Sequence, residues 1–370
     1  MRVRLIRPMP LFTIDPARYD QQLADKIDRF KADFARFNLP EPAVFESART
    51  AYRMRAEFRV WHVGTQVHYA MFNPETPRSP ILIEHFAPVA EPIARIMTPL
   101  RELISGHDEL RRKLFEIDFL ATLSGEVMVS LIYHRKLDET WADAARQLSA
   151  ALGAVVIGRS RGKKFILERD WLLERFELDG RMLEYKQVEG CFTQPNGGVN
   201  RHMLGWARSR VRGVGGDLLE LYCGNGNFTV ALAPLFDKVL ATELSKTSVY
   251  AAHYNLEANG VDNVSMVRMS SEDISDALAG GREYRRMKDV DLPGHAFSTL
   301  FVDPPRGGLD AATLALAPRF DRVLYISCNP ESLCANLDVI GQTHRIEAAA
   351  AFDQFPYTPH LECGVSLIRR

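Results

Sequence analysis

Hydrophobic and polar residues alternate in two different ways along this chain, and the change comes after the glycine-rich segment 213–216. Before it, segments 55–61 and 66–72 alternate with a period of two around a Gly-containing turn, which predicts an antiparallel hairpin. Segments 115–123 and 126–133 repeat the pattern and predict a second hairpin. Period-two alternation is typical of strands with one buried face.

Helical spacing also occurs in the first half. Apolar residues recur at steps of three and four through segment 15–37, which predicts an amphipathic helix, and segment 140–152 looks helical as well. Short apolar runs at 154–157 and 164–167 predict further strands. This half is therefore expected to be mixed, antiparallel-rich α+β structure.

After residue 216, short apolar runs alternate with helical stretches, a pattern typical of a parallel α/β sheet covered on both faces. The predicted strands are 218–222, 239–243, 264–268, 299–303, 323–327, 345–352 and 365–368. We therefore predict two domains, an N-terminal α+β region over residues 1–190 and a Rossmann-like α/β domain over residues 191–370.

Composition fits an ordinary globular protein. The chain has 370 residues, of which 46% are hydrophobic and 25% charged, and it contains no apolar run of about 18 residues that could cross a membrane. Its start, 1–8, is basic but lacks the apolar core of a signal peptide. We expect a cytoplasmic protein without membrane contact and see no evidence of an obligatory protein partner.

The five cysteines are an odd number and all lie in the second half, at 191, 223, 328, 334 and 363. No disulfide framework is implied, and no Cys-x-x-Cys pair suggests zinc or an iron–sulfur cluster. No metal site is expected. Cys191, Cys223, Cys334 and Cys363 are interpreted as packing residues, which leaves Cys328 as the candidate reactive thiol.

Net charge is −1, so nucleic-acid binding cannot be inferred from the whole molecule. Local clusters at 111–113, 134–136 and 159–164 are basic, however. Such clusters can neutralise phosphates if they share a face, and otherwise they are solvated loops and helix surfaces.

A glycine-rich loop follows the first strand of the predicted α/β domain. Gly224 and Gly226 allow a tight turn, and the helix after them presents unpaired amides. Glu243 ends the next strand 19 residues after Gly224, close to the offset of about 20 at which a carboxylate meets ribose hydroxyls. The third glycine of a dinucleotide fingerprint is missing, which favours a donor without pyrophosphate, such as S-adenosylmethionine.

Cys328 follows a buried strand and precedes Asn329-Pro330, the expected start of a helix, where thiolate formation is assisted. Asp303 begins Asp-Pro-Pro-Arg306 at the end of the fourth strand, the edge of the sheet where ligands sit. Asp303 could contact the cofactor or the edge of a base, and Arg306 could contact a phosphate. The alternative is that this Asp-Pro-Pro segment is only a tight structural turn. Downstream, Glu362 is a candidate base, with His360 as its competitor.

Together these segments resemble the RNA uracil-C5 methyltransferases, and within them most closely the bacterial branch that acts on tRNA. The resemblance runs from Tyr19 to the C-terminus and is carried by Phe192-Thr193-Gln194-Pro195-Asn196, Leu221-Tyr222-Cys223-Gly224-Asn225-Gly226-Asn227-Phe228, Asp303-Pro304-Pro305-Arg306, Ser327-Cys328-Asn329-Pro330 and His360-Leu361-Glu362-Cys363. It implies an RNA-binding role for residues 1–190 and a methyltransferase domain in residues 191–370.

The resemblance also implies S-adenosylmethionine as donor and the T-arm uridine of tRNA, position 54, as target, with tmRNA as a further candidate. By position, Cys328 is the nucleophile and Glu362 the proton acceptor. The implied cofactor residues are Gln194, Tyr222, Asn227, Glu243 and Asp303. Phe192 is a candidate surface for stacking the base, although a core aromatic is equally consistent.

Two alternatives stay open. Ribosomal RNA is a different substrate for the same chemistry, although relatives with that substrate commonly carry an iron–sulfur cluster in the N-terminal half, where this chain has no cysteine. A non-catalytic RNA-binding or chaperone protein is the alternative of another class.

Overall fold

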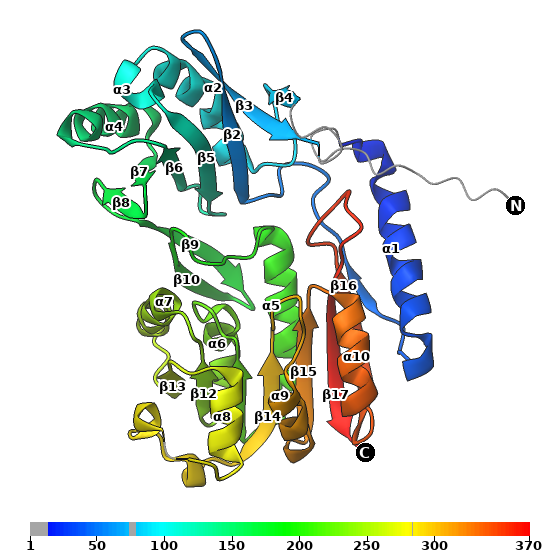
Figure 1. The fold of residues 1–370 in the computed structure, drawn as a ribbon. Coiled ribbons are helices and arrows are strands. Elements are labelled where there is room, and N and C mark those ends of the chain that lie inside the picture. The colour runs from blue at the N-terminus through cyan, green and yellow to red at the C-terminus, as the bar shows by residue number, and fades with distance from the viewer. Residues whose placement is uncertain (1–13, 74–78, 283) are drawn as a thin grey trace, which may run out of the picture. The chain divides into compact units, whose positions relative to one another are not determined.

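The computed structural model describes residues 14–73, 79–282 and 284–370. The basic start at 1–8 lies outside the described residues. The chain forms two compact units, each discontinuous in sequence (Figure 1). Among the described residues, unit 1 contains 14–17, 48–174 and 194–197, and unit 2 contains 18–47, 175–193 and 198–370.

Unit 1 is built on a seven-stranded sheet with the strand order β4-β3-β2-β5-β6-β7-β8. Its strands are β2 (Arg55–Val63), β3 (Gln66–Phe72), β4 (Pro80–Ile83), β5 (Leu114–Ala121), β6 (Val127–Tyr133), β7 (Val155–Ser160) and β8 (Lys163–Ile166). Both predicted hairpins are present, because β2 pairs antiparallel with β3 and β5 with β6. On β2, Phe58 is buried whereas Glu57 and Arg59 are exposed, as the period-two pattern predicts.

Helices α2 (Glu91–Ser105), α3 (Asp108–Arg111) and α4 (Glu139–Leu152) cover the apolar face of this sheet. Trp141 of α4 is fully buried and packs over Gly158 of β7. A Cβ atom at residue 158 would lie 2.4 Å from the Trp141 ring, so this contact requires glycine.

Unit 2 contains an eight-stranded sheet with the order β1-β16-β17-β15-β14-β11-β12-β13. Its strands are β1 (Ala43–Phe45), β11 (Asp217–Leu221), β12 (Val239–Thr242), β13 (Val264–Val267), β14 (Phe297–Val302), β15 (Arg322–Ser327), β16 (His344–Phe352) and β17 (Glu362–Arg369). The strands from β15 to β13 are parallel, and β17 runs antiparallel between β15 and β16.

Two groups of helices enclose this sheet (Figure 1). Side chains of α1, α8, α9 and α10 pack on one face, and those of α5, α6 and α7 pack on the other. The bounds are α1 (Tyr19–Asp33), α5 (Gly197–Val211), α6 (Asn227–Leu232), α7 (Lys246–Ala258), α8 (Ser271–Leu278), α9 (Ala311–Leu316) and α10 (Pro330–Ile340). On β11, Leu219 and Leu221 join the first core and Leu218 the second, which explains the unbroken apolar run.

Single 3₁₀ turns lie at Pro16–Arg18, Ala35–Phe37, Ala233–Leu235, Arg285–Met287, Leu292–Gly294 and Ala317–Arg319. The helix predicted over 15–37 is therefore shorter, with 3₁₀ turns on both sides, and the second turn ends at Asn38 in the left-handed region. The hairpin of β9 (Trp171–Leu178) and β10 (Arg181–Val188) was not anticipated.

The predicted α/β class with an antiparallel-rich α+β region is confirmed. Residues 18–47, predicted within the N-terminal region, pack in unit 2, because α1 contributes to its core and β1 pairs in parallel with β16. Within the described segments 14–73, 79–282 and 284–370, no helix has both the length and the apolar character needed to cross a membrane.

Candidate active site

The glycine loop joins β11 to α6 at the carboxyl edge of the parallel strands. Three of its residues have positive φ: Tyr222 at 60°, Gly224 at 58° and Gly226 at 79°. For a bulky residue such as Tyr222, this conformation is uncommon and strained, and such strain concentrates at functional sites. Asn255 of α7 stabilises the loop by donating from Nδ2 to the Asn225 carbonyl at 2.8 Å.

Glu243 lies beside this loop at the end of β12. Its carboxylate accepts hydrogen bonds from the Gly224 amide at 3.1 Å and from the Ser245 amide at 2.7 Å. Glu243 therefore lies against the glycine loop, and its contact with ribose hydroxyls stays a prediction. Each carboxylate oxygen has a further lone pair, so Glu243 can also accept from ribose hydroxyls. The adjacent Leu244 is 63% exposed, an apolar surface next to the loop.

Tyr222 and Asn227 are held by neighbouring side chains. The Tyr222 hydroxyl is bonded to Ser271 Oγ at 2.7 Å and Asp310 Oδ2 at 3.1 Å. Asn227 exchanges two amide hydrogen bonds with Asn200, at 2.9 and 3.0 Å. One N–H and one lone pair of the Asn227 amide remain for a ligand.

Four predicted cofactor residues, Tyr222, Asn227, Glu243 and Asp303, belong to unit 2, where strand register places Tyr222 and Asp303 at the same edge. Gln194 belongs to unit 1 and is half-buried. The neighbouring Pro195 carbonyl accepts a hydrogen bond from the Met54 amide at 2.7 Å.

Cys328 and Glu362 meet at the end of the antiparallel pair β15 and β17. Ser327, the last residue of β15, is paired with Cys363, so the residue after β15 and the first residue of β17 are Cys328 and Glu362. Opposed Cα atoms in such pairs are about 4.5–5.5 Å apart. Residues separated by 34 positions in the sequence are thus neighbours at the edge that also bears the glycine loop.

The loops after β14 and β15 are joined through Asn329. This residue caps α10 by accepting from the Glu331 amide at 3.2 Å, and its Nδ2 donates to the Arg306 carbonyl at 2.9 Å. The helix start predicted at Pro330 is confirmed. Asp303 is half-buried, whereas Arg306 is exposed to solvent.

Electrostatics at this edge differ from the expectation of an assisted thiolate. Burial, followed by the charges of Glu362 and Asp303, raises the pKa of Cys328 to about 11. Burial and the Asp303 carboxylate raise the pKa of Glu362 well above its ordinary value, and burial raises that of Asp303 to about 7. Burial and the two carboxylates outweigh the groups that lower this pKa, so the thiol stays protonated near neutral pH.

A buried ion pair secures the loop that leads into Glu362. Lys26 of α1 contacts Asp353 at 2.6 Å, with side chains 3% and 0% exposed, and also donates to the Phe355 carbonyl at 2.8 Å. Gln22 donates to Asp353 Oδ2 at 3.0 Å and accepts from the Tyr357 amide at 3.2 Å. Helix α1 therefore fixes both ends of segment 353–357 ahead of Glu362.

Comparison with known proteins agrees with this geometry. The family described as tRNA (Uracil-5-)-methyltransferase matches residues 18–370. The tRNA/tmRNA (uracil-C(5))-methyltransferase of Aromatoleum aromaticum is 66% identical over 362 residues, covering 98% of each protein. That of Dechloromonas aromatica is 61% identical over 362 residues, covering 98% of this chain and all of the other. The chain belongs to the tRNA (uracil-5-)-methyltransferase family.

The fold agrees as well. The crystal structure of Pyrococcus abyssi tRNA (uracil-54, C5)-methyltransferase in complex with S-adenosyl-L-homocysteine superposes with a TM-score of 0.72 at 21% identity. The match covers 100% of this chain and 91% of the other. The family resemblance inferred from the sequence motifs is confirmed by the family match and the similar relatives.

The exposure of individual side chains distinguishes several of the alternatives that the sequence left open. Phe192 is 67% exposed, so it is not a core aromatic. His360 is exposed, whereas Glu362 is buried. Cys223, Cys334 and Cys363 are buried, as expected of packing residues. Among the described residues, no group of three or more His, Cys, Asp or Glu side chains is arranged to hold a metal.

Sequence reasoning missed the side chains that support the loops. Asn200, Asn255 and Asp310 each hold a loop residue through hydrogen bonds. Asn255 lies inside α7, where asparagine is a poor helix former, and that was the available signal.

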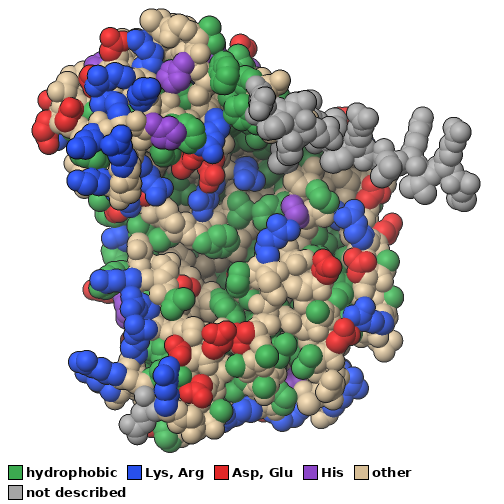
Figure 2. Space-filling model, in the orientation of Figure 1, with side chains coloured by type: hydrophobic (Ala, Val, Ile, Leu, Met, Phe, Trp, Pro, Cys, Tyr) green, Lys and Arg blue, Asp and Glu red, His purple; other side chains and the backbone are tan. Residues whose placement is uncertain are grey.

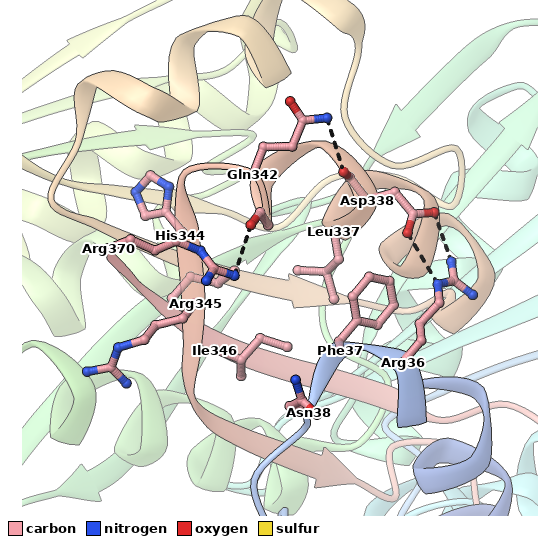
Figure 3. A pocket seen from close by; sticks show the side chains of 12 residues that line it. Arg36, Phe37, Asn38, Leu337, Asp338, Gln342, His344, Arg345, Ile346 and Arg370 are labelled. Atoms are coloured by element: carbon pink, nitrogen blue, oxygen red, sulfur yellow. Dashed lines mark hydrogen bonds and ion pairs between the residues drawn. The ribbon is translucent and has the colours of Figure 1, made fainter.

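A pocket of about 530 Å³ opens at the other edge of the unit 2 sheet. It lies between the turn after α1, the end of α10, the start of β16 and the end of β17, where Arg36 forms an ion pair with Asp338 at 2.8 Å (Figure 3). Because the end of β17 pairs with the start of β15, this pocket is remote from Cys328. It contains none of the predicted site residues.

Proposed function

We propose that this protein transfers a methyl group from S-adenosylmethionine to C5 of a uridine in the T-arm of tRNA, position 54, giving 5-methyluridine. The observation that carries the proposal is the register that sets Cys328 beside Glu362 at the edge bearing the glycine loop. Membership of the tRNA (uracil-5-)-methyltransferase family supports the substrate and the reaction.

The donor site fits this role. Glu243, Asn227, Tyr222 and Asp303 would hold S-adenosylmethionine at the glycine loop in unit 2, with Gln194 contributed by unit 1. When bound there, S-adenosylmethionine supplies an electrophilic methyl group on its sulfonium. The Glu243 carboxylate, fixed by two backbone amides, keeps lone pairs for the ribose hydroxyls.

Cys328 would activate the pyrimidine. C5 of uracil is too weak a nucleophile to accept a methyl group unaided. The Cys328 thiol loses its proton, Sγ bonds to C6, and the electrons of the C5–C6 double bond pass to C5 as an enolate. C5 then takes the methyl group as the bond from that methyl to the donor's sulfur breaks, and the sulfur keeps the electron pair. Because the thiol is protonated near neutral pH, substrate binding must assist its deprotonation.

Glu362 would release the product. Its carboxylate takes the proton from C5, the electrons of that C–H bond restore the C5–C6 double bond, and Sγ leaves C6. Burial of Glu362 keeps bulk water from this position and fixes the carboxylate, so positioning contributes several kcal/mol to catalysis. His360, which is exposed, fits this role less well.

The target must leave the RNA stack to reach these side chains. The exposed Phe192 ring is suited to stacking on the extruded base, and Arg306 to contacting a phosphate. The relatives named tRNA/tmRNA (uracil-C(5))-methyltransferase support tmRNA as a second substrate. A cytoplasmic location, where these RNAs occur, stays a prediction.

Trapping with 5-fluorouridine tests the mechanism, because fluorine cannot leave C5 as a proton. We expect tRNA containing 5-fluorouridine to form a denaturation-resistant, methylated adduct with the wild-type protein and none with Cys328→Ala. An adduct that survives Cys328→Ala would refute the nucleophile assignment. With ordinary tRNA, Glu362→Gln should accumulate the adduct, because release is blocked.

Labelled donor incubated separately with tRNA and ribosomal RNA transcripts tests the substrate. Label only in ribosomal RNA would favour the alternative substrate, and label in neither would favour a non-catalytic RNA-binding or chaperone role. A tRNA lacking the T-arm uridine should remain unlabelled.

A further inference from the structure

Three basic segments far apart in the sequence meet at one end of the unit 1 sheet. The His134 amide donates to the Lys113 carbonyl at 3.0 Å, and Arg135 Nε donates to the Arg112 carbonyl at 3.0 Å. The Ser160 hydroxyl in turn donates to the Arg135 carbonyl. The ends of β6 and β7 and the starts of β5 and β8 therefore carry one continuous group of basic loops.

The basic side chains in these loops fall into two groups. Some are engaged structurally: Arg111 donates to the Ser105 carbonyl at 2.6 Å, and Arg135 pairs with Glu109 at 2.8 Å. Others are exposed and have no ion pair among the described residues. These are Lys113, Lys136, Arg161 and Lys163, which we call the basic cluster.

Carboxylates of the adjoining elements are engaged by groups other than the cluster. Glu109 pairs with Arg135, Asp108 pairs with Arg111, and Asp138 caps α4 by accepting from the Trp141 amide at 3.1 Å. Figure 2 shows Lys and Arg side chains gathered over α3, α4 and the neighbouring strands. Four positive charges at the end of one sheet attract a polyanion.

Backbone conformation gives an independent indication. Lys113 has φ 59° and Arg161 has φ 46°, the left-handed region in which glycine and asparagine are favoured. Arg161 and Gly162, with φ 76°, form the two-residue turn between β7 and β8, a position that usually holds Asn-Gly. Charged residues kept at strained positions point to a role for the charge.

An aromatic pair borders the cluster. His134 stacks on Phe115 with ring centroids 4.0 Å apart, and the Arg59 guanidinium lies 4.1 Å from the centroid of the same ring. Basic residues beside stacked rings are typical of surfaces that contact RNA.

We infer that the basic cluster binds the phosphate backbone of the tRNA substrate. The inference rests on the proposed function and adds the surface on unit 1 by which the RNA is recruited. Because phosphate contacts carry little sequence information, the cluster supplies affinity and orientation, while selection of the uridine is left to the site in unit 2.

Substitution can separate charge from fold. Asparagine suits positive φ, so Lys113→Asn and Arg161→Asn remove charge while relaxing the backbone, and Lys136→Gln and Lys163→Gln complete the set. Equilibrium tRNA binding should be measured against KCl concentration for the wild type and the fourfold variant. Arg95→Gln is the matched control, because Arg95 is exposed on α2 ten residues before Ser105, about 15 Å along the helix.

We expect the fourfold variant to bind tRNA at least about tenfold more weakly, and its slope of log K against log salt to be smaller by about 3. KM for tRNA should rise while kcat at saturating tRNA is retained, and thermal stability should not fall. Arg95→Gln should match the wild type in all of these measurements.

An unchanged slope in a variant that methylates tRNA would overturn the inference and leave the proposed function intact, assigning the cluster to an acidic partner of another class. A wild-type protein that neither binds nor methylates tRNA would overturn both. If the fourfold variant shows a lower slope but also fails to fold, the single variant Lys136→Gln decides the question. Lys136 does not have a positive φ, so this substitution should leave the fold intact and lower the slope by about 1.

Discussion

Cys328 is surrounded by groups that disfavour its charged form. Burial is the main reason that the pKa of Cys328 is raised to about 11, and the charge of the neighbouring Glu362 carboxylate adds to it, because a thiolate beside a carboxylate costs free energy. Replacing Glu362 with Gln removes that charge. We expect the Cys328 pKa to fall, and alkylation of the Cys328 peptide, followed by mass spectrometry across pH, to reach its half-maximal rate at lower pH. Glu243→Gln is the control and should leave the midpoint in place.

The buried Glu220 side chain should make the free energy of unfolding depend on pH. It is fully buried on β11, and burial raises its pKa to about 8 against a smaller lowering by Thr229. The folded protein keeps this proton up to about pH 8, whereas the unfolded chain loses it above about pH 4.5. Stability should therefore fall as pH rises through this window, by on the order of 4 kcal/mol from this group.

Glu220→Gln cannot ionise and should flatten that dependence. Urea unfolding at several pH values between about 5 and 8 measures it. A variant with the same loss of stability on raising pH as the wild type would contradict the assignment.

Lys26 and Lys31 give a matched test on one helix. Both form ion pairs at 2.6 Å, but the Lys26 pair with Asp353 is buried, whereas in the pair of Lys31 with Glu41 the side chains are 41% and 78% exposed. Lys26→Met strands a buried carboxylate and should destabilise the fold by about 3 kcal/mol. Lys31→Met should change stability by less than about 1 kcal/mol. Equal effects in denaturant unfolding would show that burial does not decide the outcome.

At the scale of elements, the sequence carried local information well. The hairpin of β2 and β3, the helix start at Pro330 and the loop between β11 and α6 each depend on residues adjacent in the chain. The pairing of β1 with β16 joins residues about 300 positions apart, and the antiparallel insertion of β17 between β15 and β16 depends on which strands it pairs with rather than on its own residues. No periodicity records such partners, so the support that α1 gives to segment 353–357 was not foreseeable.

Replacing glycine with alanine should have opposite effects on stability in strand β7 and in helix α5. Gly158→Ala on β7 would place a methyl group 2.4 Å from Trp141 and should destabilise the fold by about 1–3 kcal/mol. Gly205→Ala on α5 meets nothing closer than 3.8 Å and should stabilise it by about 0.5–1 kcal/mol, because alanine favours helix. Thermal unfolding of both variants measures the difference, and a gain for Gly158→Ala would contradict the packing described.

At the scale of the whole molecule, the proposed reacting residues and the proposed phosphate-binding surface belong to different units. The glycine loop, Glu243, Cys328 and Glu362 all belong to unit 2, whereas the basic cluster belongs to unit 1. Basic residues contact phosphates without reading bases, so one surface can serve several RNAs that present the same folded arm. This division predicts how two substrates compete.

If tRNA and tmRNA use the same surface and the same Cys328, each should inhibit methylation of the other competitively. The inhibition constant of tmRNA against tRNA should then equal the KM of tmRNA as substrate, while varying S-adenosylmethionine should not relieve the inhibition. Initial rates with labelled donor measure both constants, and Cys328→Ala should abolish both reactions. Removing the basic cluster should raise the two constants together, because the same phosphate contacts are lost. Unequal responses would mean that tmRNA enters by a different surface.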